Sequence, residues 1–282
     1  MKRKTTYSLV DSGNGRKFET FGEYTIIRPC SQAVWLPKLK KKEWDAANAE
    51  FSRDDGNRWS RRTKLPEKWT IDVDGITFKI SPTDFGHLGI FPEQKQQWRW
   101  IHDTIKNAKN KPKVLNLFAY SGGTTLAAAR AGAEVCHLDA SKGMVAWARE
   151  NAALNKLEDA PIRWIVDDVT KFLDREMRRG NQYDAIVLDP PSFGRGSRGE
   201  IFKIEEDLTH LLKQCKKLLT PKPLFLLLSC HTPGYTPITL ENIMTQMMHD
   251  KKGTITAGEM CLEGEKDTFH LPSGTYVRWS NT

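Results

Sequence analysis

The sequence has 282 residues, long enough for one large α/β domain with a smaller appendage, and its formal net charge is +8. Its five cysteines form no C-x-x-C pair, which excludes a zinc-ribbon or disulfide framework and favours a reducing compartment. The longest apolar run, residues 224–228, is far too short to cross a bilayer, so we expect a cytoplasmic protein without membrane attachment or a bound metal.

Residues 1–83 differ in character from the rest and predict a small β-rich domain, with 84–282 as the larger α/β domain. Turn-forming residues at 11–15 separate short strand-like runs, and residues 70–80 alternate in polarity around Asp74-Gly75. An Asp-Gly pair between alternating segments is typical of a tight β-hairpin. We therefore expect antiparallel strands in this part of the chain.

Basic and aromatic residues are interleaved in the segment 38–68. It contains ten Lys or Arg residues against six Asp or Glu, and three tryptophans lie in or beside it, Trp44, Trp59 and Trp69. Positive side chains between aromatic ones suit single-stranded RNA, which is held at its phosphates and stacked at its bases. Arg61 and Arg62 are the candidate phosphate contacts. The alternative is a tryptophan core beneath a solvated, charged surface.

A glycine-bearing loop, residues 84–94, comes just before the predicted helix 94–110. Its small residues permit close backbone approach, and its position ahead of the first strand of the larger domain would let it cover a bound cofactor. Phe85 and Phe91 are candidates for packing on an adenine ring, and a purely structural role is the alternative. His87 alone predicts no catalytic function.

A strand, a small-residue turn and a helix begin the larger domain. Residues 114–118 form an apolar run of strand length, 119–123 form a turn rich in small residues, and 124–133 favour a helix. The next strand, 134–138, ends at Asp139, where an acid can hold the hydroxyls of a ribose. The turn has two adjacent glycines in place of G-x-G-x-x-G, which disfavours a dinucleotide. A nucleoside with a carboxylate and an amine, such as S-adenosylmethionine, fits better.

The third strand of this domain, residues 162–166, is followed by two carboxylates. Asp168 is placed to accept a hydrogen bond from an adenine amino group, whereas we expect Asp167 to be solvated. Helices predicted at 141–155 and 169–179 flank the strand. The alternation of strands and helices is typical of a parallel sheet covered on both faces.

The fourth strand, residues 183–188, ends in Asp189-Pro190-Pro191. Two successive prolines lack N–H donors and fix φ, so the backbone should leave the sheet as a stiff, extended edge. Because the carboxyl ends of parallel strands share one edge of a sheet, we expect the strand-end acids to lie on a common rim. Asp189 would then offer its carboxylate to a substrate.

The residues after these prolines suit a nucleic-acid substrate. Phe193 presents an aromatic face to a planar base, and the segment 194–199 reads as a flexible basic loop whose Arg195 and Arg198 can meet phosphates. A disordered connector is the alternative interpretation of this loop. A fifth strand at 224–229 and two closing strands at 254–260 and 275–279 bring the predicted sheet to seven strands.

With these motifs assembled, the chain resembles class I S-adenosylmethionine-dependent methyltransferases. The likeness is strongest to the bacterial large-subunit (23S) ribosomal RNA methyltransferase group that includes cytosine-C5 enzymes. It covers residues 80–280 and rests on the segments 114–123, 138–141, 167–169, 188–193 and 229–231. The resemblance implies a Rossmann-like seven-stranded sheet, S-adenosylmethionine as cofactor, and RNA, in particular ribosomal RNA, as substrate. Residues 1–80 do not resemble the RNA-binding module usual in the cytosine enzymes.

The resemblance also implies roles for individual residues. Phe118, Ser121 and Gly122 would line the methionine part of the cofactor. The ribose would meet Asp139, and the adenine Asp168. The full set of implied cofactor contacts is Phe91, Gln94, Asn116, Phe118, Ser121, Gly122, Asp139, Ala140, Asp167, Asp168, Asp189 and Pro190. The expected substrate contacts are Pro191, Phe193, Arg195, Arg198, Arg61 and Arg62.

Cys230 carries the most specific chemical hypothesis. Cytosine C5 becomes nucleophilic only after a thiolate adds at C6, so a C5 enzyme needs a cysteine near the cofactor methyl and an acid near N3. Cys230 stands at a strand end matching the Ser-Cys-Ser position of that group, with Asp189 as the candidate acid. The alternatives are a buried structural cysteine with methylation at a base nitrogen, or a small-molecule methyltransferase.

Overall fold

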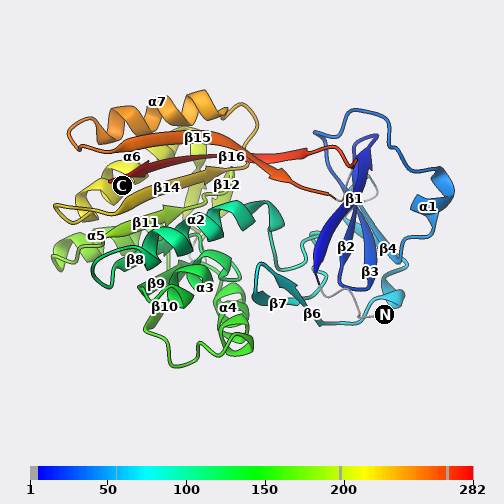
Figure 1. Cartoon of the computed structure of the whole chain (residues 1–282), viewed down its shortest axis with the longest axis horizontal. Coiled ribbons are helices and arrows are strands. Elements are labelled where there is room, and N and C mark those ends of the chain that lie inside the picture. The colour runs from blue at the N-terminus through cyan, green and yellow to red at the C-terminus, as the bar shows by residue number, and fades with distance from the viewer. Residues whose placement is uncertain (1–5, 55, 197–198, 265–266, 282) are drawn as a thin grey trace. The chain divides into compact units, whose positions relative to one another are not determined.

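The computed structural model describes residues 6–54, 56–196, 199–264 and 267–281 (Figure 1). Its contacts group the chain into two units, residues 1–95 with 261–273 and residues 96–260 with 274–282. The division into domains at 1–83 and 84–282 stays a prediction.

The first unit is built mainly from β-strands. Its five-stranded sheet has the order β1 (Tyr7–Gly13), β2 (Arg16–Phe21), β3 (Tyr24–Pro29), β4 (Ala49–Ser52) and β5 (Arg58–Ser60). The unit also contains the short helix α1 (Lys41–Asp45) and the hairpin of β6 (Trp69–Val73) and β7 (Ile76–Ile80). Asp74 and Gly75 both have positive φ, +60° and +73°, as a two-residue hairpin turn requires. The predicted β-rich N-terminal unit is confirmed.

The three tryptophans of the basic segment serve the core of this unit. Trp44 is buried beside Phe18, and its indole Nε1 donates to Asp11 Oδ2 at 3.2 Å. The other two are half-buried and donate to main-chain carbonyls, Trp59 to Thr83 at 2.8 Å and Trp69 to Phe21 at 3.0 Å. Because these indoles are anchored internally, the structural alternative describes them better than base stacking does.

The second unit contains a seven-stranded sheet. The sheet order is β10 (Ile162–Val166), β9 (Glu134–Asp139), β8 (Lys113–Leu117), β11 (Ala185–Leu188), β14 (Phe225–Cys230), β16 (Leu271–Ser280) and β15 (Thr254–Leu262). The first five strands pair in parallel, and β16 is antiparallel to β14. The predicted Rossmann-like α/β fold with seven strands is confirmed.

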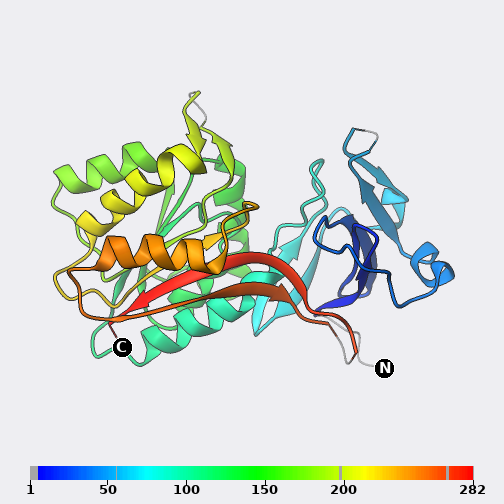
Figure 2. The same ribbon diagram turned by 90° about the horizontal axis from the view of Figure 1, so that it is seen from above.

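Helices cover both faces of this sheet (Figure 2). They are α2 (Lys95–Lys106), α3 (Gly123–Arg130), α4 (Lys142–Leu154), α5 (Val169–Arg178), α6 (Ile204–Leu218) and α7 (Pro237–Met248). Alternate strand residues point to opposite faces. Leu115 and Leu226 pack in the core beneath α5, α6 and α7, whereas their neighbours Val114 and Phe225 pack in the core beneath α2 and α3. Because both faces are covered in this way, the buried strands are mainly apolar along their whole length.

The strands β15 and β16 run from one unit into the other. Residues 261–273, at the turn end of this hairpin, belong to the first unit. There Leu262 and Leu271 are buried together with Leu9 and Ala33. The sequence predicted strands at 254–260 and 275–279, and both extend further toward this turn than expected.

Candidate functional site

The turn between β8 and α3 is built so that main-chain groups line the edge of the sheet. Phe118, Tyr120 and Gly122 have positive φ values of +55°, +49° and +94°. Gly122 is the N-cap residue of α3, and Asn151 of α4 donates to the Ser121 carbonyl at 2.9 Å. The helix N-terminus that follows presents free N–H groups, which attract a carboxylate.

Asp139 joins this turn to the start of α4. Its Oδ2 accepts from the Tyr120 N–H at 2.9 Å, and its Oδ1 accepts from the Ser141 N–H at 2.8 Å. Burial raises the pKa of Asp139, and the two backbone N–H groups offset part of that rise. The carboxylate therefore lies at the carboxyl end of β9, next to the turn. Ser141 caps α4 by accepting from the Met144 N–H.

We expect Gly122→Ala to lower the free energy of unfolding by about 1–3 kcal/mol, because a side chain is strained at this φ. The new Cβ would also lie 3.1 Å from Ala148 Cβ, so α4 would have to shift and disturb the turn. Gly132 is the matched control, since its φ is +98° and a Cβ added there would meet nothing within 4 Å. Urea denaturation and calorimetry with S-adenosylmethionine should show loss of stability in both variants, but weaker cofactor binding only for Gly122→Ala.

The side chain of Asn116 is committed to a buried network. Its Nδ2 donates to Thr125 Oγ1 at 2.9 Å, and that hydroxyl lies 2.9 Å from His137 Nδ1. Burial, followed by the charge of Arg149, lowers the pKa of His137 to about 3, so the imidazole is neutral at physiological pH. The network links β8, α3 and β9. Of these three residues only Asn116 was predicted, on the strength of the family resemblance. Thr125 and His137 were not predicted, because a single polar residue in a buried element leaves the hydrophobic pattern of that element unchanged.

The two acids after β10 have different partners. Asp168 is the N-cap of α5 and accepts from the Lys171 N–H at 3.0 Å. Asp167 makes an ion pair with Arg175 and accepts from the Asp168 N–H at 2.9 Å, so it is not simply solvated as expected. The Asp167 N–H donates to the Asp139 carbonyl at 3.2 Å. The ends of β9 and β10 therefore meet, as the predicted common rim requires.

Asp189 sits between the ends of β11 and β14. Its Oδ1 accepts from Ser229 Oγ at 2.7 Å and lies 3.4 Å from His231 Nε2. A second bridge joins the same segments, because the hydroxyls of Ser192 and Thr232 are 2.7 Å apart. Ser229, His231 and Thr232 were not predicted as site residues. A Ser-Cys-His-Thr run at a strand end was the available signal.

Cys230 lies in the same strand end, but its thiol is enclosed. The residue is 1 % exposed, and burial raises the pKa of the thiol. A raised pKa leaves little thiolate, which is the nucleophilic form. Gly274 of β16 packs against this segment, since a Cβ there would lie 3.0 Å from the Cys230 carbonyl oxygen.

The segment predicted as a flexible loop contains a short hairpin. The strands β12 (Phe193–Arg195) and β13 (Ile201–Lys203) pair antiparallel, and the Phe202 ring lies 5.4 Å from the ring of Phe118. Phe193 is 51 % exposed, with the Arg195 guanidinium 5.7 Å from its ring centre. The predicted phosphate contact Arg198 lies outside the described residues.

The remaining predicted residues fall in several places. Ala140 follows Asp139, Pro190 is buried and Pro191 is exposed. Phe91 and Gln94 belong to the first unit, in and just before the short 3-10 turn Pro92–Gln94.

Arg61 and Arg62 also belong to the first unit. Arg61 Nη1 donates to the Asp45 carbonyl at 2.6 Å, and Arg62 Nη1 donates to the Leu65 carbonyl at 3.3 Å. Part of each guanidinium is thus held internally, and a phosphate contact from either stays a prediction.

In the described ranges, no group of three or more His, Cys, Asp or Glu residues is arranged to hold a metal ion. No helix in these ranges is both long and apolar enough to cross a membrane.

A family model described as S-adenosylmethionine-dependent methyltransferase matches residues 40–246 of the chain. The chain belongs to this family. A crystal structure of the S-adenosylmethionine-dependent methyltransferase from Agrobacterium tumefaciens is 40% identical, covers 98% of this chain and 90% of that chain, and superposes with a TM-score of 0.93. The methyltransferase SMU.776, solved in complex with S-adenosylhomocysteine, has a TM-score of 0.76 at 21% identity, over 99% of this chain and 76% of that chain. This second likeness shows the fold alone.

The curated relatives are much longer than this chain, and the similarity covers only a small part of their length. The ribosomal RNA large subunit methyltransferase K/L of Pseudoalteromonas translucida is 35% identical over 201 residues, which are 71% of this chain and 26% of the relative. The chain therefore spans about a quarter of the length of this relative.

The residues at the sheet edge fit the cofactor of the family. Gly122 gives the turn its positive φ directly before the N-terminus of α3, and Asp139 brings a carboxylate to the end of β9. The predicted enzyme class and cofactor are confirmed. The cytosine-C5 position stays a prediction.

Proposed function

We propose that this methyltransferase transfers the methyl group of S-adenosylmethionine to a base of RNA, with ribosomal RNA as the substrate. The observation that carries the proposal is the similarity over 201 residues to a ribosomal RNA large subunit methyltransferase. Two features support it. The net charge of +8 favours a polyanionic substrate, and Phe193 with Arg195 offers an aromatic face and a cation on one exposed hairpin.

Bound S-adenosylmethionine supplies an electrophilic methyl group. Asp139 would hold the ribose hydroxyls, and the turn around Gly122 would receive the methionine part against the N-terminus of α3. Asp168 would face the adenine. Asp189, oriented by the Ser229 hydroxyl, would accept a hydrogen bond from the target base and orient its reacting atom.

Two versions of the base chemistry differ in the role of Cys230. Methylation at cytosine C5 needs a thiolate that adds to C6 and leaves again after proton loss from C5. Methylation at a base nitrogen needs no thiol. The enclosed Cys230 with its raised pKa favours the version without a covalent adduct.

We expect Cys230→Ala to keep methyl transfer within about threefold of the wild type, because a thiol that stays protonated adds little nucleophilic catalysis. The measurement is tritium transfer from labelled S-adenosylmethionine to undermodified ribosomal RNA. Cys215→Ala is the matched control, since Cys215 is also buried and lies in α6. A loss of more than about a hundredfold in Cys230→Ala alone would restore the covalent mechanism.

The proposed function itself is tested by mass spectrometry of RNA nucleosides. Ribosomal RNA from cells lacking the protein is incubated with the enzyme and S-adenosylmethionine, digested and compared with untreated RNA. We expect one methylated nucleoside to appear, and its fragmentation identifies the modified atom. Efficient cofactor binding without any new methylated nucleoside would contradict an RNA substrate and favour a small molecule.

A further inference from the structure

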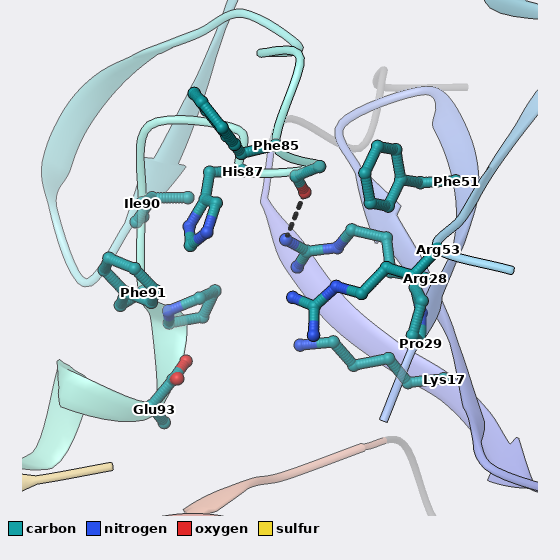
Figure 3. A pocket seen from close by; sticks show the side chains of 12 residues that line it. Lys17, Arg28, Pro29, Phe51, Arg53, Phe85, His87, Ile90, Phe91 and Glu93 are labelled. Atoms are coloured by element: carbon teal, nitrogen blue, oxygen red, sulfur yellow. Dashed lines mark hydrogen bonds between the residues drawn. The ribbon is translucent and has the colours of Figure 1, made fainter. Parts of the chain in front are cut away.

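A pocket lies within the first unit, and none of the residues used above for base chemistry lines it (Figure 3). Lys17 and Arg28, from the sheet, and Arg53, just after β4, bring three cations to one side. Phe85 and His87, from the loop that follows β7, line the other side. The combination of cations and rings in one concave site calls for a ligand with both an anionic and a planar part.

The pocket walls are connected by Arg28. Its Nε and Nη2 donate to the two carboxylate oxygens of Glu19 at 2.7 and 2.8 Å, and its Nη1 donates to the Gly86 carbonyl at 3.3 Å. Gly86 has a φ of +78°, and a Cβ there would overlap the ring of Phe51. The loop therefore approaches the sheet wall as closely as a glycine allows.

The loop also holds its own shape. Thr83 Oγ1 accepts from the His87 N–H at 3.1 Å, the Thr83 N–H donates to the His87 carbonyl at 2.9 Å, and Trp59 Nε1 donates to the Thr83 carbonyl at 2.8 Å. On this fixed loop Phe85 is 69 % exposed. A large apolar ring held in solvent at the mouth of a cationic pocket is a ready surface for stacking.

The side of the pocket formed by Lys17, Arg28 and Arg53 is the side that favours an anion. Lys17 and Arg28 both pair with Glu19, at 3.3 and 2.7 Å, whereas Arg53 and the buried Glu93 also line the pocket. Burial, followed by the charges of these three cations, lowers the pKa of His87 to about 4. At neutral pH His87 is therefore an uncharged ring, which can stack on a base and offers one donor and one acceptor nitrogen.

We propose that this pocket binds one unpaired nucleotide of the RNA substrate, with its phosphate at Lys17 and Arg53 and its base against Phe85 and His87. The inference rests on the proposed function, since it assigns a second contact for the same RNA. A site of this kind tolerates many sequences, because every base has a face for stacking. It would hold a single-stranded segment of the substrate rather than a duplex.

The test is binding of a fluorescein-labelled, unstructured eight-nucleotide RNA to the full chain, followed by fluorescence anisotropy. Phe85→Ala should weaken binding by about tenfold, as expected for one lost base stack. Arg53→Ala should weaken it too, and should lower the slope of log affinity against log salt concentration by about 0.7, one phosphate contact in a single strand. The matched controls are Arg130→Ala and Ile238→Ala, which remove an exposed cation and an exposed apolar side chain outside this pocket and outside the segment 38–68.

Phe85 and Arg53 are exposed, so both variants should fold, and thermal denaturation checks this. Wild-type RNA affinity in Phe85→Ala and Arg53→Ala would overturn the pocket assignment, while RNA methylation by the wild type would leave the proposed function standing. Loss of S-adenosylmethionine affinity with unchanged RNA binding would assign the pocket to the cofactor and likewise overturn the inference. If the wild type neither binds nor methylates RNA, the proposed function itself is refuted, and the pocket assignment fails with it.

Discussion

Replacing Asp189 with asparagine should lower the rate of methyl transfer by a factor of about 10² to 10⁴, the usual contribution of a positioned acid–base group. Asparagine has nearly the same shape, and its side-chain oxygen can still accept from Ser229 Oγ, which lies 2.7 Å from Asp189 Oδ1. The strand ends should therefore keep their arrangement. What is lost is the negative charge beside the target base and the ability to accept its proton.

Three measurements make the result specific to Asp189. Single-turnover transfer to RNA reports the chemical step, calorimetry reports S-adenosylmethionine affinity, and thermal denaturation reports folding. Asp159→Asn is the matched control, because Asp159 is exposed and lies in the connection before β10. Transfer by Asp189→Asn above a tenth of the wild-type rate would rule out an acid–base role, and a large loss of cofactor affinity at an unchanged rate would make Asp189 a cofactor ligand.

Glu19→Gln should lower the free energy of unfolding by about 3–5 kcal/mol, the usual cost of removing one partner of a buried ion pair. Glu19 is fully buried and accepts from Arg28 and from the Tyr7 hydroxyl, at 3.0 Å, while Lys17 Nζ lies 3.3 Å away. Glutamine keeps the size of the side chain but leaves the Arg28 cation buried without its counter-charge. Urea denaturation at neutral pH measures the loss.

The pH dependence of this difference has a definite sign. Burial alone would raise the pKa of Glu19, but Arg28 and Lys17 outweigh burial, and the pKa lies below its ordinary value. A lowered folded-state pKa stabilises the protein fully above the ordinary pKa, and the contribution is lost as the pH falls through the lowered value. The gap between wild type and Glu19→Gln should therefore narrow in acid.

A surface pair supplies the control for Glu19. Lys41 and Asp45 form an i,i+4 pair at 2.8 Å whose side chains are 89% and 60% exposed. Asp45→Asn should cost no more than about 0.5 kcal/mol. Equal losses in Asp45→Asn and Glu19→Gln would show that burial of the Glu19–Arg28 pair has no special effect.

The strand-end acids could be predicted from the sequence because each follows a mainly apolar run of strand length. A buried parallel strand needs apolar residues on both faces, so the first acid after it marks the edge of the sheet. Asp139 and Asp189 both stand in that position, and the structure places them at the ends of β9 and β11. The local sequence pattern was sufficient to predict these two acids, because the carboxyl ends of parallel strands lie at one edge of the sheet whatever the order of the strands.

The tryptophans show where local pattern is ambiguous. Trp44 and Trp59 alternate with cations whether they stack on bases or fill a core, and their burial depends on Phe18, Phe51 and the loop at Thr83. The hairpin of β12 and β13 was missed because its glycine-rich segment lacks apolar alternation. The Glu19–Arg28 pair forms because β2 pairs with β3. The pocket beside it forms because the loop at Gly86, far along the chain, contacts Arg28. The spacing of residues in the sequence predicts neither contact.

The position of Leu262 and Leu271 in the first unit has a consequence for protein synthesis. These two residues fill the core around Leu9 and Ala33, yet they are translated more than 200 residues after them. The growing polypeptide cannot complete this apolar cluster while its early part emerges from the ribosome. Leu9 and its neighbours stay open to water, or to a chaperone, until the polypeptide has been made as far as Leu271.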